Sequence, residues 1–582
     1  MSRGFTIPKS PVRFSLELLL MIAIASAILL RIINLGSREF WYDEVLSLIL
    51  SNGQQVNYKA PGDLPVVLRD YTALLSLPAE SSLGEVIKTV KNVFNGILGD
   101  VHPPLSYLSL HFWMRLFGNS EAAMRSLMAL MSVGAIGSAY GLGRIVLGHR
   151  GGLLLAALLG TNPFFLFHSL NARMYAPLVL WTTLSTWAML ELMEARGEEL
   201  KVRGLNVEDS DQQPQPANLQ PANLQPANLQ PSKPSVSHQI LWSVVLIGSV
   251  AAGLLTQYLF AYWVITLGVF VLVFDRRRWW QQGLRLGAGI LLWIPWFFWG
   301  TRHQSRLREV GGQFSKGTHL GDIAQTLGTH LLLGDWVTSL PTAIAIVAGC
   351  VVVVVLFACT ITLWRQGERR KLGVALILGI FPLLLALTVD IVTRKYSIGF
   401  GGGRSMLFIL PGCLLLLALW LERSAGRWRE PAAAVLLLLY LSISIGDFST
   451  RQRWLFHDLA NLIQQNPTTP TLVAMNSRAW GHILRLAYYI PPTAPVRLLA
   501  QNPADLAPAL DKILTTEAQR YPRVIWLNSA RPVNKAPKTE AEKEQIQKDI
   551  QRVLNSKFKL VKTQQLSGTM ILDDFTLNLY TR

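Results

Sequence analysis

The sequence contains little charge for its length. Asp, Glu, Lys and Arg make up 15% of the 582 residues, whereas 51% are hydrophobic. So few charges cannot coat the roughly four soluble domains that a chain of this length would otherwise suggest. Most of the chain must therefore face lipid, which excludes a largely disordered protein, a coiled coil and a small disulfide-stapled fold.

Cysteine and nucleotide-binding motifs are also scarce. Cys350, Cys359 and Cys413 all lie in apolar runs, which favours a packing role over redox chemistry or a metal cluster. The glycines of 399–403 are not followed by the Gly-Lys-Ser/Thr of a phosphate-binding loop, so we expect them to form a flexible loop. The sequence therefore gives no sign of a nucleotide substrate.

Acidic residues are outnumbered by basic ones, 36 against 54, which gives a net charge of +18. Much of the excess lies in short loops beside apolar runs, as the positive-inside rule describes. This placement favours lipid headgroups or an anionic substrate as partners over nucleic acid.

Eleven apolar stretches are read as membrane spans, for a bilayer core of about 30 Å. They cover residues 16–33, 122–146, 152–170, 174–193, 240–256, 258–274, 284–299, 341–363, 372–392, 406–421 and 432–445. With the N-terminus in the cytoplasm, every strongly basic short loop falls on the cytoplasmic side, provided that the apolar stretch 102–118 is not a full span. We therefore predict a polytopic helical protein of the plasma (inner) membrane, with about 11 to 13 transmembrane helices.

Composition changes divide the chain into four parts. Residues 1–194 form an N-terminal membrane module with a large external loop at 34–121, and residues 239–446 supply the later transmembrane helices. Between them, 195–238 carries Gln-Pro-Ala-Asn-Leu repeats and predicts a disordered cytoplasmic linker. Residues 447–582 predict a soluble, extracytoplasmic α/β domain. Its helices are expected at 456–465 and 541–554, and its strands at 471–475, 524–527, 559–563 and 570–580.

Two groups of polar residues lie in the predicted external loop. Asp43 and Glu44 follow the first span beside Trp41 and Tyr42, and could form a general-base site or simply cap a helix at the membrane edge. Asp100 and His102 precede a double proline that fixes the backbone before an apolar helix. We expect both groups at the external membrane surface.

Several cations break the positive-inside pattern, because they are predicted on the external side. Arg173 either snorkels to the interface or clamps a phosphate, since guanidinium matches phosphate oxygens with paired donors. Arg394, Lys395 and Arg404 lie around the glycine-rich stretch and favour the phosphate interpretation.

The stretches Trp-Tyr-Asp-Glu at 41–44, His-Pro-Pro-Leu-Ser-Tyr at 102–107 and Ala-Arg-Met-Tyr at 172–175 resemble the integral-membrane GT-C glycosyltransferases. The nearest group is the protein O-mannosyltransferase and aminoarabinose transferase superfamily, similar to glycosyltransferase family 39. The sequence departs from that family at Gln257, where relatives often have His, and at Ser405, where Tyr often follows the arginine.

The resemblance implies sugar transfer, usually with inversion, from a polyprenyl-phosphate donor to an acceptor on the outer side of the membrane. Asp43 would be the base and Glu44 would hold the loop or the acceptor. Arg173, Arg404, Arg394 and Lys395 would bind the donor phosphate. Residues that would position the acceptor or the loop are Asp100, His102, Tyr175 and Tyr258.

The acceptor could be a lipid, a glycan or a protein, and a requirement for a divalent metal ion stays open. Two alternatives stay open beside the polyprenyl-phosphate enzyme. One is a polytopic transporter or flippase of lipid-linked saccharides, and the other is an enzyme of the same architecture with an oligosaccharide donor.

Overall fold

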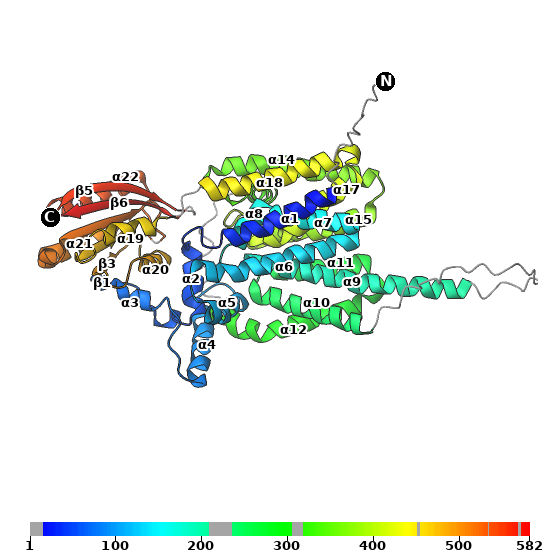
Figure 1. Cartoon of the computed structure of the whole chain (residues 1–582), viewed down its shortest axis with the longest axis horizontal. Helices are drawn as coiled ribbons and strands as arrows, with labels where there is room; N and C mark the ends of the chain where they lie inside the picture. Colours follow the sequence, from blue (N-terminus) through cyan, green and yellow to red (C-terminus); the bar gives the residue numbers. More distant parts are fainter. Residues whose placement is uncertain (1–15, 209–235, 305–317, 451–453, 534, 569–571) are drawn as a thin grey trace, which may run out of the picture.

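The computed structural model describes residues 16–208, 236–304, 318–450, 454–533, 535–568 and 572–582. A bundle of long helices forms the larger part, and a small α/β domain lies beyond one end of it (Figure 1). The predicted division into a helical membrane part and a C-terminal α/β domain is confirmed.

Seven helical segments of the described chain are long and apolar enough to cross a membrane, and a bent pair makes an eighth. The seven are α1 (Leu16–Ile33), α6 (Glu121–Leu147), α10 (Val236–Thr256), α14 (Thr342–Arg365), α15 (Arg369–Gly379) with α16 (Phe381–Thr393), α17 (Leu410–Arg423) with the 3-10 turn before it, and α18 (Arg429–Thr450) with the turn before it. The bent pair is α7 (His149–Thr161) and α8 (Pro163–Ser169), which meet at 63°. Asn162 causes the break, because its side chain caps α8 just before Pro163.

The other three predicted spans are also helical, as α9 (Tyr175–Glu208), α11 (Phe260–Phe274) and α12 (Trp279–Gln304). Helix α9 runs into the predicted linker at one end and α10 begins before its other end. The remaining linker residues, 209–235, lie outside the described part of the chain.

The predicted external loop folds into four short helices beside one end of the bundle. They are α2 (Tyr42–Ser51), α3 (Leu68–Ala73), α4 (Leu83–Ile97) and α5 (Leu105–Phe117). With 13 residues, α5 is about 20 Å long, which is too short to cross a bilayer core of about 30 Å.

The basic loops meet at the opposite end of the bundle. Arg150, in the first turn of α7, pairs with Glu422 of α17 at 2.9 Å, and Arg423 pairs with Glu368 at 3.5 Å. Arg144 stands near this end of α6, roughly 28 Å along the helix from Arg125. The basic loops therefore share one end, as the positive-inside pattern predicts.

The C-terminal domain is a six-stranded mixed sheet covered on both faces. The strand order is β1-β3-β2-β4-β6-β5, with β1 (Val66–Val67), β2 (Thr471–Met475), β3 (Val496–Ala500), β4 (Arg523–Ser529), β5 (Lys559–Ser567) and β6 (Asp574–Thr581). Its four helices are α19 (Phe456–Gln464), α20 (Trp480–Tyr489), α21 (Pro503–Glu517) and α22 (Glu540–Asn555). The predicted helices and strands appear, although the strand predicted at 570–580 begins at Asp574 and residues 570 and 571 lie outside the described part of the chain. The elements α20, β3 and α21 were not anticipated from the sequence.

The edge strand β1 (Val66–Val67) comes from the loop after α1, and it pairs antiparallel with β3. Nearby, the Thr72 hydroxyl donates to the Ala487 carbonyl, 415 residues along the chain. The loop and the C-terminal domain are thus one folded body, which fixes the loop against the domain.

Candidate active site

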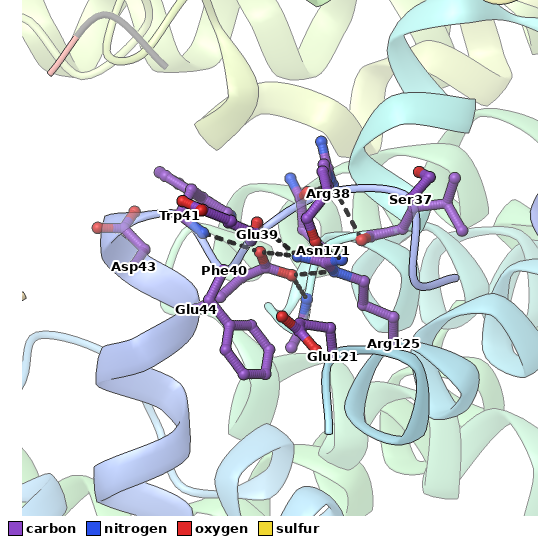
Figure 2. Close-up of polar contacts among 12 residues, drawn as sticks. Ser37, Arg38, Glu39, Phe40, Trp41, Asp43, Glu44, Glu121, Arg125 and Asn171 are labelled. Atoms are coloured by element: carbon purple, nitrogen blue, oxygen red, sulfur yellow. Dashed lines mark hydrogen bonds and ion pairs between the residues drawn. The ribbon is translucent and has the colours of Figure 1, made fainter. Parts of the chain in front are cut away.

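The first turn of α2 carries the two adjacent carboxylates. Glu44 reaches back to accept a hydrogen bond from the Trp41 backbone at 3.2 Å, which satisfies a free N–H at the start of the helix. Because neighbouring residues of a helix point in different directions, Asp43 faces away from Glu44 (Figure 2).

Glu44 is fully buried and paired with the fully buried Arg125 of α6. The guanidinium donates to both carboxylate oxygens, at 2.7 and 2.8 Å, and the Ala172 backbone donates to one of them at 2.8 Å (Figure 2). Burial alone would raise the pKa of Glu44, but Arg125 and the nearby Arg38 hold it below its ordinary value. Arg125 also binds the backbone carbonyls of Arg38 and Glu39. This pair therefore fixes the loop that leads to Asp43.

Asp43 is 21% exposed and lies beside Arg404. One guanidinium nitrogen of Arg404, Nη2, stands 3.2 Å from Oδ2 of Asp43. Arg404 is also held over the rings of Trp41 and Phe400, at 4.9 and 5.4 Å from their centroids. The closest opposite charge to Asp43 therefore comes from a residue 361 positions away.

The glycine-rich stretch before Arg404 is held by neighbouring helices. Gly401, Gly402 and Gly403 all have positive φ, from 58° to 87°, a backbone region that other residues rarely adopt. The Thr329 hydroxyl donates to the Gly402 carbonyl at 2.7 Å, and His330 lies 3.0 Å from the Gly403 carbonyl. The glycines thus serve a fixed turn that aims Arg404, where the sequence suggested a flexible loop.

Arg173 contacts the backbone of Asp43 and is almost fully buried. Its Nη1 contacts the Ser47 and Tyr107 hydroxyls at 3.2 Å each, and the Asp43 carbonyl at 3.4 Å. Burial works against its charge, but Tyr107, Asp43 and Asp100 raise the pKa of Arg173 above its already high value. Arg173 is therefore a permanent cation at this site.

Asp100 and His102 join the same network through Tyr107. The Tyr107 hydroxyl donates to Oδ2 of Asp100, and Nδ1 of His102 lies 3.0 Å from that oxygen. Burial would raise the pKa of Asp100, but His102 and Arg173 keep it below its ordinary value. Asp100 is thus an anion that orients Tyr107 toward Arg173.

Tyr258 is linked to this network through Gln304. Its hydroxyl donates to Gln304 at 2.5 Å, and Gln304 donates in turn to the backbone carbonyl of His102 at 3.1 Å. The Trp296 indole donates to the same Tyr258 hydroxyl at 2.9 Å. Tyr258 therefore braces the segment before α5 through Gln304 of α12.

Tyr175 is buried at the start of α9, against a His–Asp pair. Its ring meets that of His168 at a centroid distance of 4.8 Å, and His168 lies 3.1 Å from Asp335. Arg394 and Lys395, by contrast, are exposed at the C-terminal end of α16. The structure thus gathers Arg173 and Arg404 around Asp43, while Arg394 and Lys395 stay at the surface.

Comparisons with known proteins identify similar sequences and folds. Residues 101–203 match the family described as dolichyl-phosphate-mannose-protein mannosyltransferase. The apo structure of ArnT from Cupriavidus metallidurans has a TM-score of 0.50 and 13% identity over 96% of this chain and 97% of that chain. The predicted GT-C resemblance is confirmed. So is the prediction of a multi-pass membrane glycosyltransferase.

Two further GT-C structures are similar at lower scores. ArnT bound to undecaprenyl phosphate gives a TM-score of 0.46 and 12% identity, covering 96% of this chain and 98% of that chain. The S. cerevisiae protein O-mannosyltransferase Pmt1-Pmt2 complex, bound to the sugar donor, gives 0.31 and 12% identity, covering 50% of this chain and 34% of that chain. No curated protein sequence matches the chain.

The two departures from the GT-C family pattern touch each other. The Gln257 side-chain amide donates to the Ser405 carbonyl at 3.2 Å, directly after Arg404. Gln257 therefore steadies the turn that carries Arg404, a contact that an amide side chain can make.

Three residues of the GT-C site were not anticipated from the sequence. Arg125 lies inside a predicted span, and a charge at such a position is a functional signal that could have been used. Arg38 donates to the carbonyl of Leu170, and Glu39 contacts the C-terminal domain. Among the described residues, no group of three or more His, Cys, Asp or Glu side chains comes together as a metal site.

Proposed function

We propose that this glycosyltransferase moves a sugar from a polyprenyl-phosphate donor to an acceptor on the outer side of the membrane. Asp43 acts as the base in an inverting attack. The observation that carries the proposal is a partly exposed carboxylate with two cations at the same residue: Arg404 lies 3.2 Å from Oδ2 of Asp43, and Arg173 contacts the Asp43 backbone carbonyl at 3.4 Å. ArnT, whose fold the chain shares, has also been solved with undecaprenyl phosphate bound.

The chemistry needs one base and a way to stabilise the leaving group. Asp43 takes the proton of the acceptor hydroxyl or amine as that atom attacks the anomeric carbon of the sugar. The bond from this carbon to the phosphate oxygen breaks, and the lipid phosphate leaves as an anion. Arg173 and Arg404 balance its charge, so no general acid is required, unlike in a glycoside hydrolase.

The remaining site residues support this pair. Glu44, saturated by Arg125, holds the loop, while Asp100, His102 and Tyr258 orient Tyr107 and the start of α5. Tyr175 packs below the site. The exposed Arg394 and Lys395 offer a first contact for the donor phosphate at the membrane surface.

The placement of the basic loops supports the outer side. They gather at the end of the bundle away from Asp43, and Lys and Arg of short loops favour the cytoplasm. The site and the C-terminal domain then lie outside the cytoplasm. The donor lipid reaches the site through the bilayer, and the acceptor is a lipid, a glycan or a protein.

The test is an assay of the purified full chain with a polyprenyl-phosphate sugar and a panel of acceptors. Acceptor-dependent release of free polyprenyl phosphate supports the proposal. Transbilayer movement of the intact lipid-linked sugar in proteoliposomes, without release, would instead show a flippase. Release only from an oligosaccharide donor would correct the donor class.

A further inference from the structure

The C-terminal domain contacts the segment that leads to Asp43. We propose that Tyr489 of α20 is a positioning residue for sugar transfer, which holds residues 39–42 so that Asp43 faces the substrate. This inference rests on the proposed role of Asp43 as the base.

The central contact is a hydroxyl that bridges two parts of the membrane module. The Phe40 backbone N–H donates to the Tyr489 hydroxyl at 2.7 Å, and this hydroxyl donates to Oε1 of Glu121 at 2.8 Å. Phe40 is fully buried, so its N–H has no access to water as an alternative partner. The Tyr489 hydroxyl thus fixes a backbone atom three residues before Asp43 relative to the start of α6.

A second contact fixes the residue before Phe40. The Glu39 carboxylate accepts hydrogen bonds from the backbone N–H groups of Phe456 and His457, at 3.0 and 2.6 Å. These two N–H groups begin α19, where a carboxylate is favoured by the free donors and the helix dipole. The Glu39 side chain therefore caps α19 from outside the helix. In this way it attaches the segment to the domain.

A third contact lies directly beside Asp43. The Tyr42 ring meets the edge of His482 at a centroid distance of 5.2 Å and covers Gly481. A Cβ on Gly481 would lie 2.7 Å from the Tyr42 ring, so only glycine admits this approach. The domain thus holds residues 39, 40 and 42, while Arg125 holds Glu44 from within the membrane module.

The contacts from the C-terminal domain and from Arg125 matter because catalysis depends on the placement of the base, Asp43. A displacement of about 1 Å in a catalytic group can cost about 10²-fold in rate. The domain also docks on the external loop away from Asp43, through β1 and Thr72. The contacts with residues 39, 40 and 42 differ from these, because they tie the geometry of the base to the domain.

The experiment compares Tyr489→Phe with Tyr488→Phe in the purified full chain. Both hydroxyls bind the membrane module, but that of Tyr488 donates to the Asn119 carbonyl at 3.2 Å, away from the segment before Asp43. Each variant loses one oxygen and keeps its ring, so the two are matched in size and position. We expect Tyr489→Phe to lower kcat at least about 10-fold, with the KM for donor and acceptor and the thermal midpoint close to those of Tyr488→Phe.

Equal kcat values for the two variants would overturn the inference. A fall in kcat that accompanies an equal fall in thermal midpoint in both variants would do so as well. If Tyr489→Phe alone unfolds, Glu39→Gln supplies the second measurement, because it keeps the shape of the side chain but removes the charge that caps α19. In that variant, wild-type kcat with intact folding would also count against positioning.

The failure of this inference is separable from that of the proposed function. If Asp43→Asn keeps normal turnover, Asp43 is not the base and the proposed function fails, whatever Tyr489→Phe does. If Asp43→Asn is inactive and Tyr489→Phe matches Tyr488→Phe, the base stands and only its positioning by the C-terminal domain is wrong.

Discussion

Asp43 and Glu44 are neighbours in the chain, but their carboxylates lie in opposite environments. Glu44 has no exposed surface and forms an ion pair with Arg125, whereas Asp43 is partly exposed and faces Arg404. The Glu44 carboxylate therefore has a structural role, and the Asp43 carboxylate is accessible to a substrate. This division makes the two residues respond differently to the same substitution.

The first prediction concerns Asp43→Asn, which keeps the shape of the side chain but removes the base. We expect the rate of polyprenyl-phosphate release to fall by about 10² to 10⁴-fold, the usual cost of losing a general base. The thermal midpoint in detergent should stay near that of the wild type, because Asp43 is partly exposed. Normal turnover in this variant would remove Asp43 from catalysis.

The second prediction concerns Arg404. Changing Arg404 to Ala should lower the transfer rate by about 10² to 10³-fold, because the leaving phosphate loses a cation in a water-poor site. Arg404→Lys should restore only part of the rate, since an ammonium lacks the planar donor pair. Arg394→Ala is the surface control, for which we expect a smaller loss. Steady-state kinetics with varied donor would show the result, and equal losses in all three variants would contradict it.

The third prediction concerns stability, through Arg125→Met. Removing one partner of a buried ion pair leaves the other charge uncompensated, at a cost of about 3 to 5 kcal/mol. We expect a lower thermal midpoint together with loss of activity. The double variant Arg125→Met with Glu44→Gln should recover part of the stability. An unchanged midpoint for Arg125→Met alone would mean that the pair contributes little.

The fourth prediction concerns the side of the membrane. Lys88 of α4 is exposed at the end of the bundle that carries Asp43, and Arg427 is exposed between α17 and α18 at the other end. In a background without the three native cysteines, Lys88→Cys should react with an impermeant thiol reagent on intact cells. Arg427→Cys should react only after the membrane is opened. The reverse pattern would place the site in the cytoplasm.

The fifth prediction concerns pH and the contact between Glu39 and His457. The hydrogen bond with Glu39 raises the pKa of His457, with further support from the charges of Glu39, Glu121 and Asp458. A raised pKa means that the contribution to stability is full below the unfolded value of about 6.5 and is lost as pH rises through the folded value. Thermal unfolding from pH 5 to 9 should show this loss in the wild type and a flatter profile in His457→Asn. Parallel profiles would show that His457 does not titrate in this way.

The local features of the fold could be predicted from the sequence. Apolar runs gave all eleven helical stretches, and the amphipathic pattern gave α19 and α22 with nearly the observed ends. These features depend on residues close together in the chain, which periodicity reports. Of these stretches, seven or eight are long and apolar enough in the described chain to cross a membrane, and α11 is a shorter apolar helix.

The contacts that build the site could be predicted only in part. Asp43, Arg173 and Arg404 were singled out as charges in unusual places, and the structure brings them together. The pairing of Glu44 with Arg125 and of Glu39 with α19 was missed, because partners far apart in sequence leave no periodic signal. From the sequence alone, Arg394, Lys395 and Arg404 looked alike as external cations. Only the folded glycine turn places Arg404 beside Asp43 and leaves Arg394 and Lys395 at the surface.

The pairing of β1 and α3 with the C-terminal domain has a consequence for biosynthesis. The Thr72 hydroxyl donates to the carbonyl of Ala487, which the ribosome adds 415 residues later. At about 5 to 20 residues per second, that interval lasts roughly 20 to 80 s. During this time, the segment that carries Asp43 lacks its contacts with the C-terminal domain, so we expect the membrane helices to be made before the site is complete.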